Sequence, residues 1–200
     1  PRVQVLTLAS SRHGVVAADA YLAVGNAPLP RDKFWAALVG VTDWRAEGTT
    51  FIEAGQQRCA LSAPCDGIRP YTASQVRSVD YDFRVLDRVL GAGLYYRFRV
   101  ERVVDEPVGV WRAVVCTGSS GCLELARRQL EVDTLPYAVI GAESNGATWN
   151  KVWVSGARML EDGAISWTDW CRANASSVEN PADGLSFISP CDGRANAWTV

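Results

Sequence analysis

Short apolar segments with alternating side chains recur along this chain from end to end. In residues 81–85, Tyr81, Phe83 and Val85 alternate with charged side chains, and residues 96–101 repeat the pattern. This two-residue period is typical of strands that bury one face. Gly, Pro, Asp and Asn interrupt the segments roughly every ten residues, which is the spacing of strands in a sandwich or barrel. No segment has a sustained helical period.

The pattern predicts an all-β fold, a two-sheet antiparallel β-sandwich of jelly-roll character with about ten to twelve strands. A chain of 200 residues fits one domain of this kind, so we expect a single domain over 1–200. Residues 1–12 contain enough apolar side chains for a further strand or arm, and residues 124–131 could be a helix or a strand. The last segment, 171–200, is rich in small and polar residues and is expected to be irregular. The expected strands are 15–24, 34–42, 50–54, 81–90, 95–104, 111–116, 123–132, 137–142, 149–160 and 165–170.

Six cysteines indicate disulfides and not a metal site. None lies in a C-x-x-C step, and the single histidine, His13, is distant in sequence, whereas zinc sites favour such steps. Neighbouring cysteines close the shortest loops, which favours one of the fifteen possible pairings. Disulfides persist in oxidising compartments, so we predict a secreted or cell-surface protein. The expected pairs are Cys59–Cys65, Cys116–Cys122 and Cys171–Cys191.

Charge and motifs argue against several other classes of protein. The net charge of −2 provides no basic surface for nucleic acid. No apolar run approaches the roughly 20 residues of a membrane span, and neither a P-loop nor a dinucleotide fingerprint is present. We therefore expect no nucleic-acid partner, membrane span, cofactor or metal. Asn174 begins an N-glycosylation sequon, Asn-Ala-Ser.

Several short motifs carry a resemblance to a known family. Together they resemble the concanavalin A-like sandwiches of the glutamic peptidase (eqolisin) superfamily and its bacterial secreted relatives, over roughly residues 15–160. The motifs are FWAALVG at 34–40, FIEAG at 51–55, YRFRVE at 96–101 with WRA at 111–113, and GAES at 141–144.

The resemblance also bears on the active site. Active members of that family use a Gln and a Glu on neighbouring strands of the concave sheet; the Glu activates water and the Gln stabilises the oxyanion. The resemblance places Glu53 at the Gln position, and Ala138 and Val139 near the position of the catalytic Glu. It therefore implies that the catalytic pair is not retained in place.

A hydrolytic function could still use other residues. Glu53 and Glu143 could face each other across one sheet, with Gln56 nearby, and two close carboxylates can divide acid and base roles. A glycosidase would need such a pair within about 10 Å. The alternative is that each carboxylate ends a strand or pairs with an arginine such as Arg97.

The eight tryptophans suggest a carbohydrate-binding function. Exposed aromatic rings stack on the apolar faces of sugars. Trp149 and Trp153 would share one face of a strand, and Trp44 is a third candidate ligand-binding residue. The alternative is that most of these rings fill the core.

These observations lead to one main prediction of function and two alternatives. We predict a non-catalytic secreted or cell-surface module that binds a glycan or another extracellular polymer, or that serves as a structural surface component. The first alternative is a glutamic-peptidase-like or other acid-type hydrolase that uses Glu53 and Glu143. The second is a fibre subunit, or another homo-oligomer, joined through residues 1–12, since such a strand can pair at home or in a neighbouring subunit.

Overall fold

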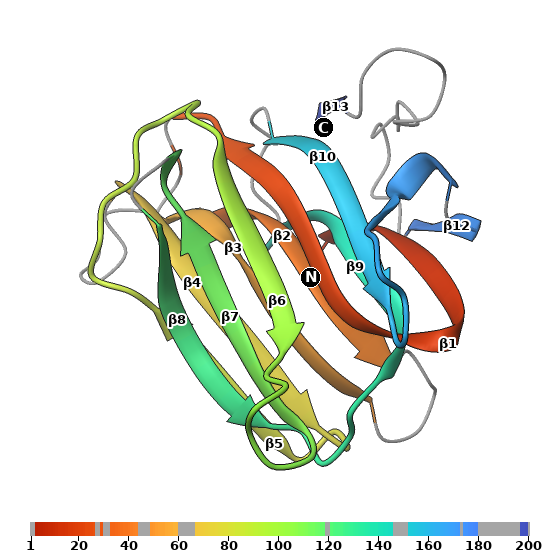
Figure 1. Ribbon diagram of the computed structural model, residues 1–200. Helices are drawn as coiled ribbons and strands as arrows, with labels where there is room; N and C mark the ends of the chain where they lie inside the picture. The colour runs from red at the N-terminus through yellow and green to blue at the C-terminus, as the bar shows by residue number, and fades with distance from the viewer. Residues whose placement is uncertain are drawn as a thin grey trace.

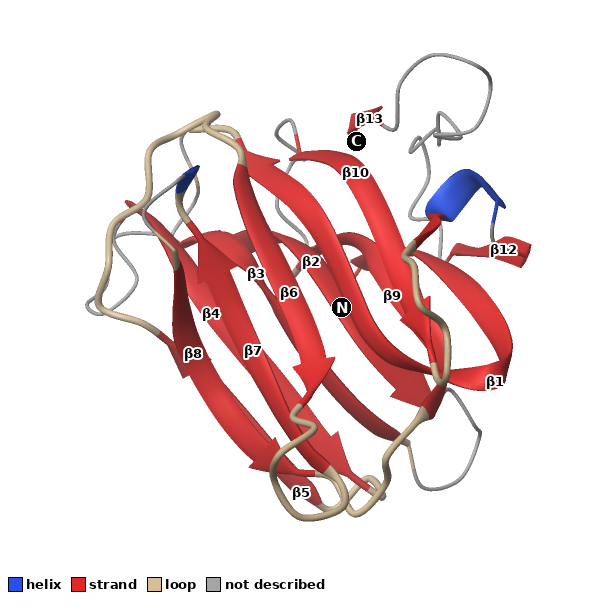
Figure 2. Ribbon diagram, viewed as in Figure 1, coloured by secondary structure: helices blue, strands red, loops and turns tan. Residues whose placement is uncertain are grey.

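The computed structural model describes residues 3–26, 29, 33–43, 49–59, 67–118, 121–145, 152–172, 174–179 and 197–199. Most of these residues form antiparallel strands, as predicted (Figure 2). The elements are β1 (Val3–Val24), β2 (Phe34–Asp43), β3 (Thr50–Cys59), β4 (Gly67–Val76), β5 (Asp80–Val85), β6 (Tyr96–Arg102), β7 (Val110–Cys116), β8 (Cys122–Gln129), β9 (Leu135–Ser144), β10 (Val152–Glu161), β11 (Thr168–Asp169), the 3-10 turn η2 (Trp170–Arg172), β12 (Asn174–Glu179) and β13 (Ala197–Thr199).

The strands form two layers that share β1 (Figure 1). The first half of β1 pairs with β9 and β12, whereas its second half pairs with β6 and β10. One layer, the β3 sheet, has the order β5-β4-β3-β2-β9-β1. The other layer, the β6 sheet, continues from β1 through β6 and β7 to β8, with β10 on the other side of β1.

The long strand β1 changes sheets near Gly14. The register of β1 with β9 shifts between Ser10 and Val15. Gly14 has a φ of 87°, and a Cβ there would lie 2.5 Å from the Thr134 Cβ. Glycine is suited to position 14 because it has no Cβ, so it adopts a positive φ and allows this close approach.

The two layers enclose an aliphatic and aromatic core. Val39 and Ile52 from the β3 sheet belong to one buried cluster with Phe98 and Trp111 from the β6 sheet. A second buried cluster, with Leu6, Leu38, Tyr71 and Val139 among its members, lies on the opposite face of the β3 sheet. Both faces of the central strands are therefore apolar, and polar side chains among them stand out.

The N-terminal strand pairs within its own chain. Leu6 pairs with Gly141 on one side and Val178 on the other, so both edges of this segment are occupied. The partners of this segment within the chain are thus β9 and β12.

Some expected boundaries were wrong. Residues 67–76 form β4, which the sequence did not predict, and β5 ends at Val85 although a strand was expected to continue to residue 90. The ambiguous segment at 124–131 is strand β8 to Gln129, and the C-terminal region expected to be irregular contains strand β12. No helix of the described part is long and apolar enough to span a membrane.

Candidate functional site

The outer face of the β3 sheet, the face turned away from the β6 sheet, carries the candidate site. Successive residues of β3 alternate between the two faces. Ile52 and Ala54 lie in the core between the sheets, so Glu53, Gly55 and Gln57 point to the outer face. The exposed fractions of Glu53 and Gln57 are only 8% and 3%.

Glu53 lies beside a glycine on the neighbouring strand. Its register partners are Gly40 on β2 and Ala73 on β4. A Cβ on Gly40 would lie 2.9 Å from the Glu53 Cβ and 2.6 Å from the Ile52 carbonyl oxygen. Glycine is needed at position 40 because the two backbones and the Glu53 side chain approach so closely.

A second glycine lies between Glu53 and Gln57. A Cβ on Gly55 would lie 2.0 Å from the Ala37 carbonyl oxygen and 2.9 Å from Cε1 of Tyr71. The Tyr71 ring therefore covers Gly55, which leaves Glu53 and Gln57 on either side of a phenol ring.

Glu143 and Gln57 lie in one row of the sheet. Both pair with Ala36, Glu143 from β9 and Gln57 from β3, and the row continues to Arg69 on β4. Two strand spacings separate their Cα atoms by about 10 Å. Because Ala36 offers only a methyl group between them, side chains as long as Glu and Gln can meet above it. The three polar members of the row are between 2% and 7% exposed.

Arg69 extends this row toward solvent. Its guanidinium group donates to the carboxylate of Asp87 at 2.5 Å, and Asp87 is almost fully exposed. The row thus carries an amide, a carboxylate and a guanidinium group on one buried surface.

The two predicted carboxylates are well separated on this face. Gly40, the partner of Glu53, lies four residues along β2 from Ala36, the partner of Glu143. Combined with two strand spacings, this register places the Cα atoms of Glu53 and Glu143 about 16 Å apart. Across Gly40, Glu53 faces Val139 on β9. The carboxylates share a face but are not register neighbours.

Gln56 lies on the opposite face from both glutamates. It is fully buried between the sheets, and its amide nitrogen donates to the backbone carbonyl of Leu22 on β1. The Gln56 side chain therefore links the two sheets and does not reach the candidate site on the outer face. Gln57, one residue further on, reaches the outer face, and the two-residue period from Glu53 could have identified it.

Aromatic rings line the β5 end of the same face. The ring centroids of Tyr71 and Phe83 are 5.8 Å apart, and those of Phe51 and Tyr81 are 6.4 Å apart. Tyr81 and Phe83 are about half exposed, and their strand lies at the edge of the sheet. This edge offers apolar contacts to a ligand that lies on the outer face.

The tryptophan side chains that the structure describes are buried or half buried. Trp35, Trp111 and Trp170 are buried in the core, Trp153 is half buried, and no described Trp side chain is exposed. Trp44 and Trp149 lie outside the described residues. Core packing therefore accounts for most of the rings that can be placed.

One predicted disulfide is confirmed directly. Cys116 and Cys122 are bonded and close the β7–β8 hairpin. Cys59 is also disulfide-bonded. Its expected partner Cys65, and Cys191 of the third expected pair, lie outside the described residues.

Asn174, the glycosylation candidate, lies on β12 and is paired with Ser10 of β1. The described residues contain no group of three or more His, Cys, Asp or Glu that could hold a metal ion.

Comparison with known proteins identifies the fold. No protein-family model matches the chain, and no curated protein matches it in sequence. Crystal structures of scytalido-glutamic peptidase with transition-state analogues match it with TM-scores of 0.63 and 0.66 at 14% and 11% identity. These matches cover 99% and 98% of this chain and 96% of the peptidase.

A further match supports the same fold. SCP-B, a member of the eqolisin family in complex with the tripeptide Ala-Ile-His, matches with a TM-score of 0.61 at 14% identity, over 99% of this chain and 96% of that one. The chain therefore has the fold of the glutamic peptidases, as its motifs predicted.

Proposed function

We propose that this protein is a glutamic-peptidase-like hydrolase that holds an extended peptide on the outer face of the β3 sheet. The observation that carries the proposal is the row Glu143–Ala36–Gln57, which puts a carboxylate and an amide on one face of β9 and β3, the two strands that flank β2. The fold shared with peptidases that bind peptide-based inhibitors and a tripeptide supports a peptide as substrate.

In this proposal, Glu143 and Gln57 divide the chemistry. The Glu143 carboxylate accepts a proton from water as the water attacks the scissile carbonyl, and it returns the proton to the leaving amine. The Gln57 amide donates a hydrogen bond to the oxyanion of the tetrahedral intermediate. Both side chains are almost fully buried, and the low dielectric of such a site strengthens these interactions.

Glu53 and the aromatic edge then contribute to substrate binding. Glu53 lies about 16 Å from Glu143 along the same face, a span of about five extended residues. Its carboxylate can accept a hydrogen bond from the substrate backbone or pair with a basic side chain. Tyr81 and Phe83 offer contact surface to apolar substrate side chains.

Replacement of Glu143 by Gln is expected to lower peptide hydrolysis at least about 100-fold, since the proton acceptor is lost. The measurement is cleavage of an unfolded protein substrate from acidic to neutral pH, followed by mass spectrometry of the products. Gln57→Ala should reduce kcat by a similar factor, whereas Glu106→Gln, which changes an exposed carboxylate on another surface, should behave as wild type. Full activity of Glu143→Gln would rule out the proposed pair.

A second candidate is a non-catalytic secreted protein that binds peptides on the same face. Val139, not an acid, faces Glu53 across Gly40, which agrees with the loss of the family pair that the motifs imply. This candidate predicts that wild-type protein binds an extended peptide without cleaving it. The Cys116–Cys122 disulfide suits an oxidising location outside the cytosol in either case.

A further inference from the structure

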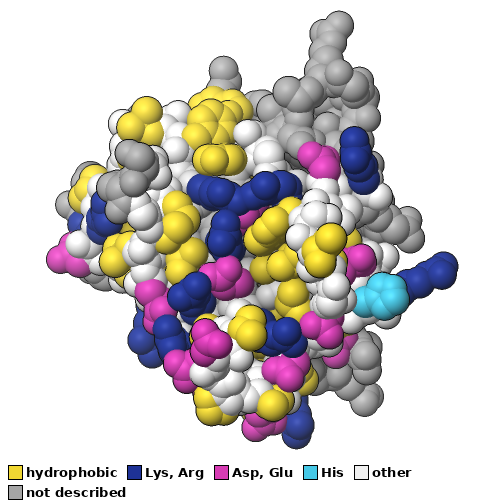
Figure 3. Space-filling view, viewed as in Figure 1, with side chains coloured by type: hydrophobic (Ala, Val, Ile, Leu, Met, Phe, Trp, Pro, Cys, Tyr) yellow, Lys and Arg dark blue, Asp and Glu magenta, His cyan; other side chains and the backbone are white. Residues whose placement is uncertain are grey.

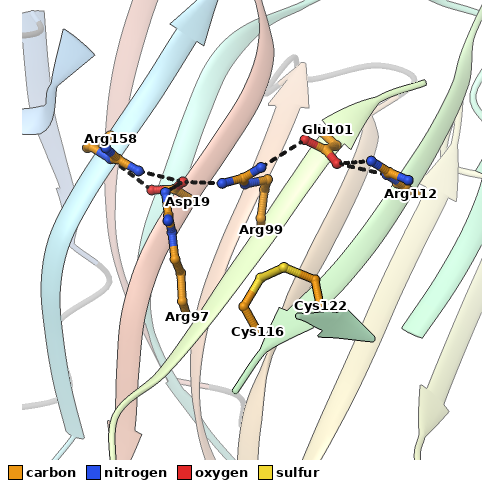
Figure 4. The surroundings of a disulfide bond; sticks show 8 residues. All are labelled: Asp19, Arg97, Arg99, Glu101, Arg112, Cys116, Cys122 and Arg158. Carbon is orange, nitrogen blue, oxygen red and sulfur yellow. Dashed lines mark hydrogen bonds and ion pairs between the residues drawn. A yellow bond between two sulfur atoms is a disulfide. The ribbon is translucent and has the colours of Figure 1, made fainter. Parts of the chain in front are cut away.

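The outer face of the β6 sheet contains an ionic cluster built around one buried carboxylate. Asp19 on β1 is 1% exposed, and its register partners are Arg158 on β10 and Arg99 on β6. Arg97, two residues before Arg99 on β6, also reaches Asp19. Figure 4 shows the guanidinium groups of Arg97, Arg99 and Arg158 converging on Asp19.

Three arginines compete for the same oxygen atom. Arg158 donates to Asp19 through Nε at 3.1 Å and Nη2 at 3.0 Å, Arg97 donates to Oδ2, and Nη2 of Arg99 lies 3.4 Å from Oδ2. One carboxylate offers about four acceptor positions, whereas three guanidinium groups carry about fifteen N–H donors. Asp19 can satisfy only a minority of them.

The neighbouring carboxylate does not remove the excess of positive charge. Glu101 accepts from Arg112 at 2.6 Å and 2.7 Å and lies 3.4 Å from Arg99. The cluster of Arg97, Arg99, Arg112 and Arg158 with Asp19 and Glu101 therefore keeps two positive charges in a chain whose net charge is −2. Within the described part of the chain, the buried Nε groups of Arg97 and Arg99 have no hydrogen-bond partner.

Aromatic rings hold these guanidinium groups in place. Arg97 lies over the Tyr21 ring at 5.9 Å, and Arg99 and Arg158 each lie 5.1 Å from the centre of the Trp167 ring. Contacts of this kind restrict arginine side chains and leave their edges available. The three side chains remain 23% to 36% exposed, and Figure 3 shows basic side chains gathered on this face.

We propose that Arg97, Arg99 and Arg158 form a binding site for a tetrahedral oxyanion, a sulfate or phosphate group. Guanidinium groups bind such groups through paired N–H donors, and fixed guanidinium groups lose little entropy on binding. Asp19 holds the three arginines together through ion pairs. The ligand accepts hydrogen bonds from the N–H donors that Asp19 does not use. The site is independent of the proposed peptidase function, because it lies on the outer face of the other sheet.

The test is thermal unfolding and titration calorimetry of the full chain with sodium sulfate and with sodium phosphate, at constant ionic strength set by sodium chloride. Binding to the folded state raises Tm with ligand concentration, so both anions should raise Tm above the chloride reference. Arg99→Gln and Arg158→Gln should each weaken binding at least about tenfold.

The matched control is Arg127→Gln on the same face. The Arg127 guanidinium already donates to Glu124 at 2.8 Å and 3.0 Å and to Glu106 at 2.5 Å, so its loss should leave binding unchanged. Dextran sulfate and neutral dextran distinguish a polymer-borne sulfate from a free anion: tighter binding of dextran sulfate per sulfate group than of sodium sulfate identifies the polymer as the source.

Two results would overturn the site. One is a wild-type protein for which sulfate and phosphate give no heat of binding and no rise of Tm beyond chloride, a measurement that needs no variant to fold. The other is wild-type affinity in both Arg99→Gln and Arg158→Gln.

Discussion

Replacing Trp111 by alanine should lower the free energy of unfolding by about 4 kcal/mol. Trp111 lies on β7 with no exposed surface, in the cluster that joins the two sheets. Its indole nitrogen also donates to the Val132 carbonyl at 2.7 Å. The variant loses apolar burial, leaves a cavity and removes the donor to that carbonyl, and each effect favours unfolding.

Urea unfolding followed by circular dichroism measures this loss. Trp111→Phe keeps most of the apolar volume and should cost about half as much. Leu123→Ala, at a position of β8 that is 44% exposed, should stay within about 0.5 kcal/mol of wild type. A Trp111→Ala protein as stable as the Leu123→Ala protein would contradict the packing described for the core.

Replacing Asp19 by alanine should lower the free energy of unfolding by about 3 kcal/mol, near the low end for a broken buried ion pair because the arginines keep some contact with water. The variant leaves Arg97, Arg99 and Arg158 close together without their shared carboxylate. Burial raises the pKa of Asp19, and Arg158 and Arg99 oppose that rise.

The matched control for this change is Asp162→Ala. Asp162 is 45% exposed and pairs with Arg102 at 3.2 Å, so its loss should cost less than about 1 kcal/mol. Urea unfolding at neutral pH compares the two variants. Equal stability of Asp19→Ala and Asp162→Ala would show that the cluster contributes no more than a surface ion pair.

The sequence predicted the all-β fold class and most of the strands, because apolar and polar side chains alternate wherever a strand buries one face. It missed β4, since Pro70 lies inside that segment and a proline argues against a central strand. Pro70 nevertheless pairs with Gln56, and its carbonyl accepts from the Leu86 backbone at 3.0 Å. The sequence also gave no sign that one strand continues through residues 10–15 into the second sheet.

The candidate site was only partly predictable because its geometry depends on strand register. Glu53 and Glu143 were identified as candidates, and the structure places both on one face. Their separation depends on the register across β2, which no local pattern specifies. The row Glu143–Ala36–Gln57 likewise requires three strands from distant parts of the chain.

The most direct test of the peptide site is a crystal structure of the Glu143→Gln variant grown with an extended peptide. The proposed site predicts a peptide along the outer face of the β3 sheet, with its backbone above Ala36 and within hydrogen-bond distance of the Gln57 amide. A peptide bound only on another surface, with this face empty, would contradict it.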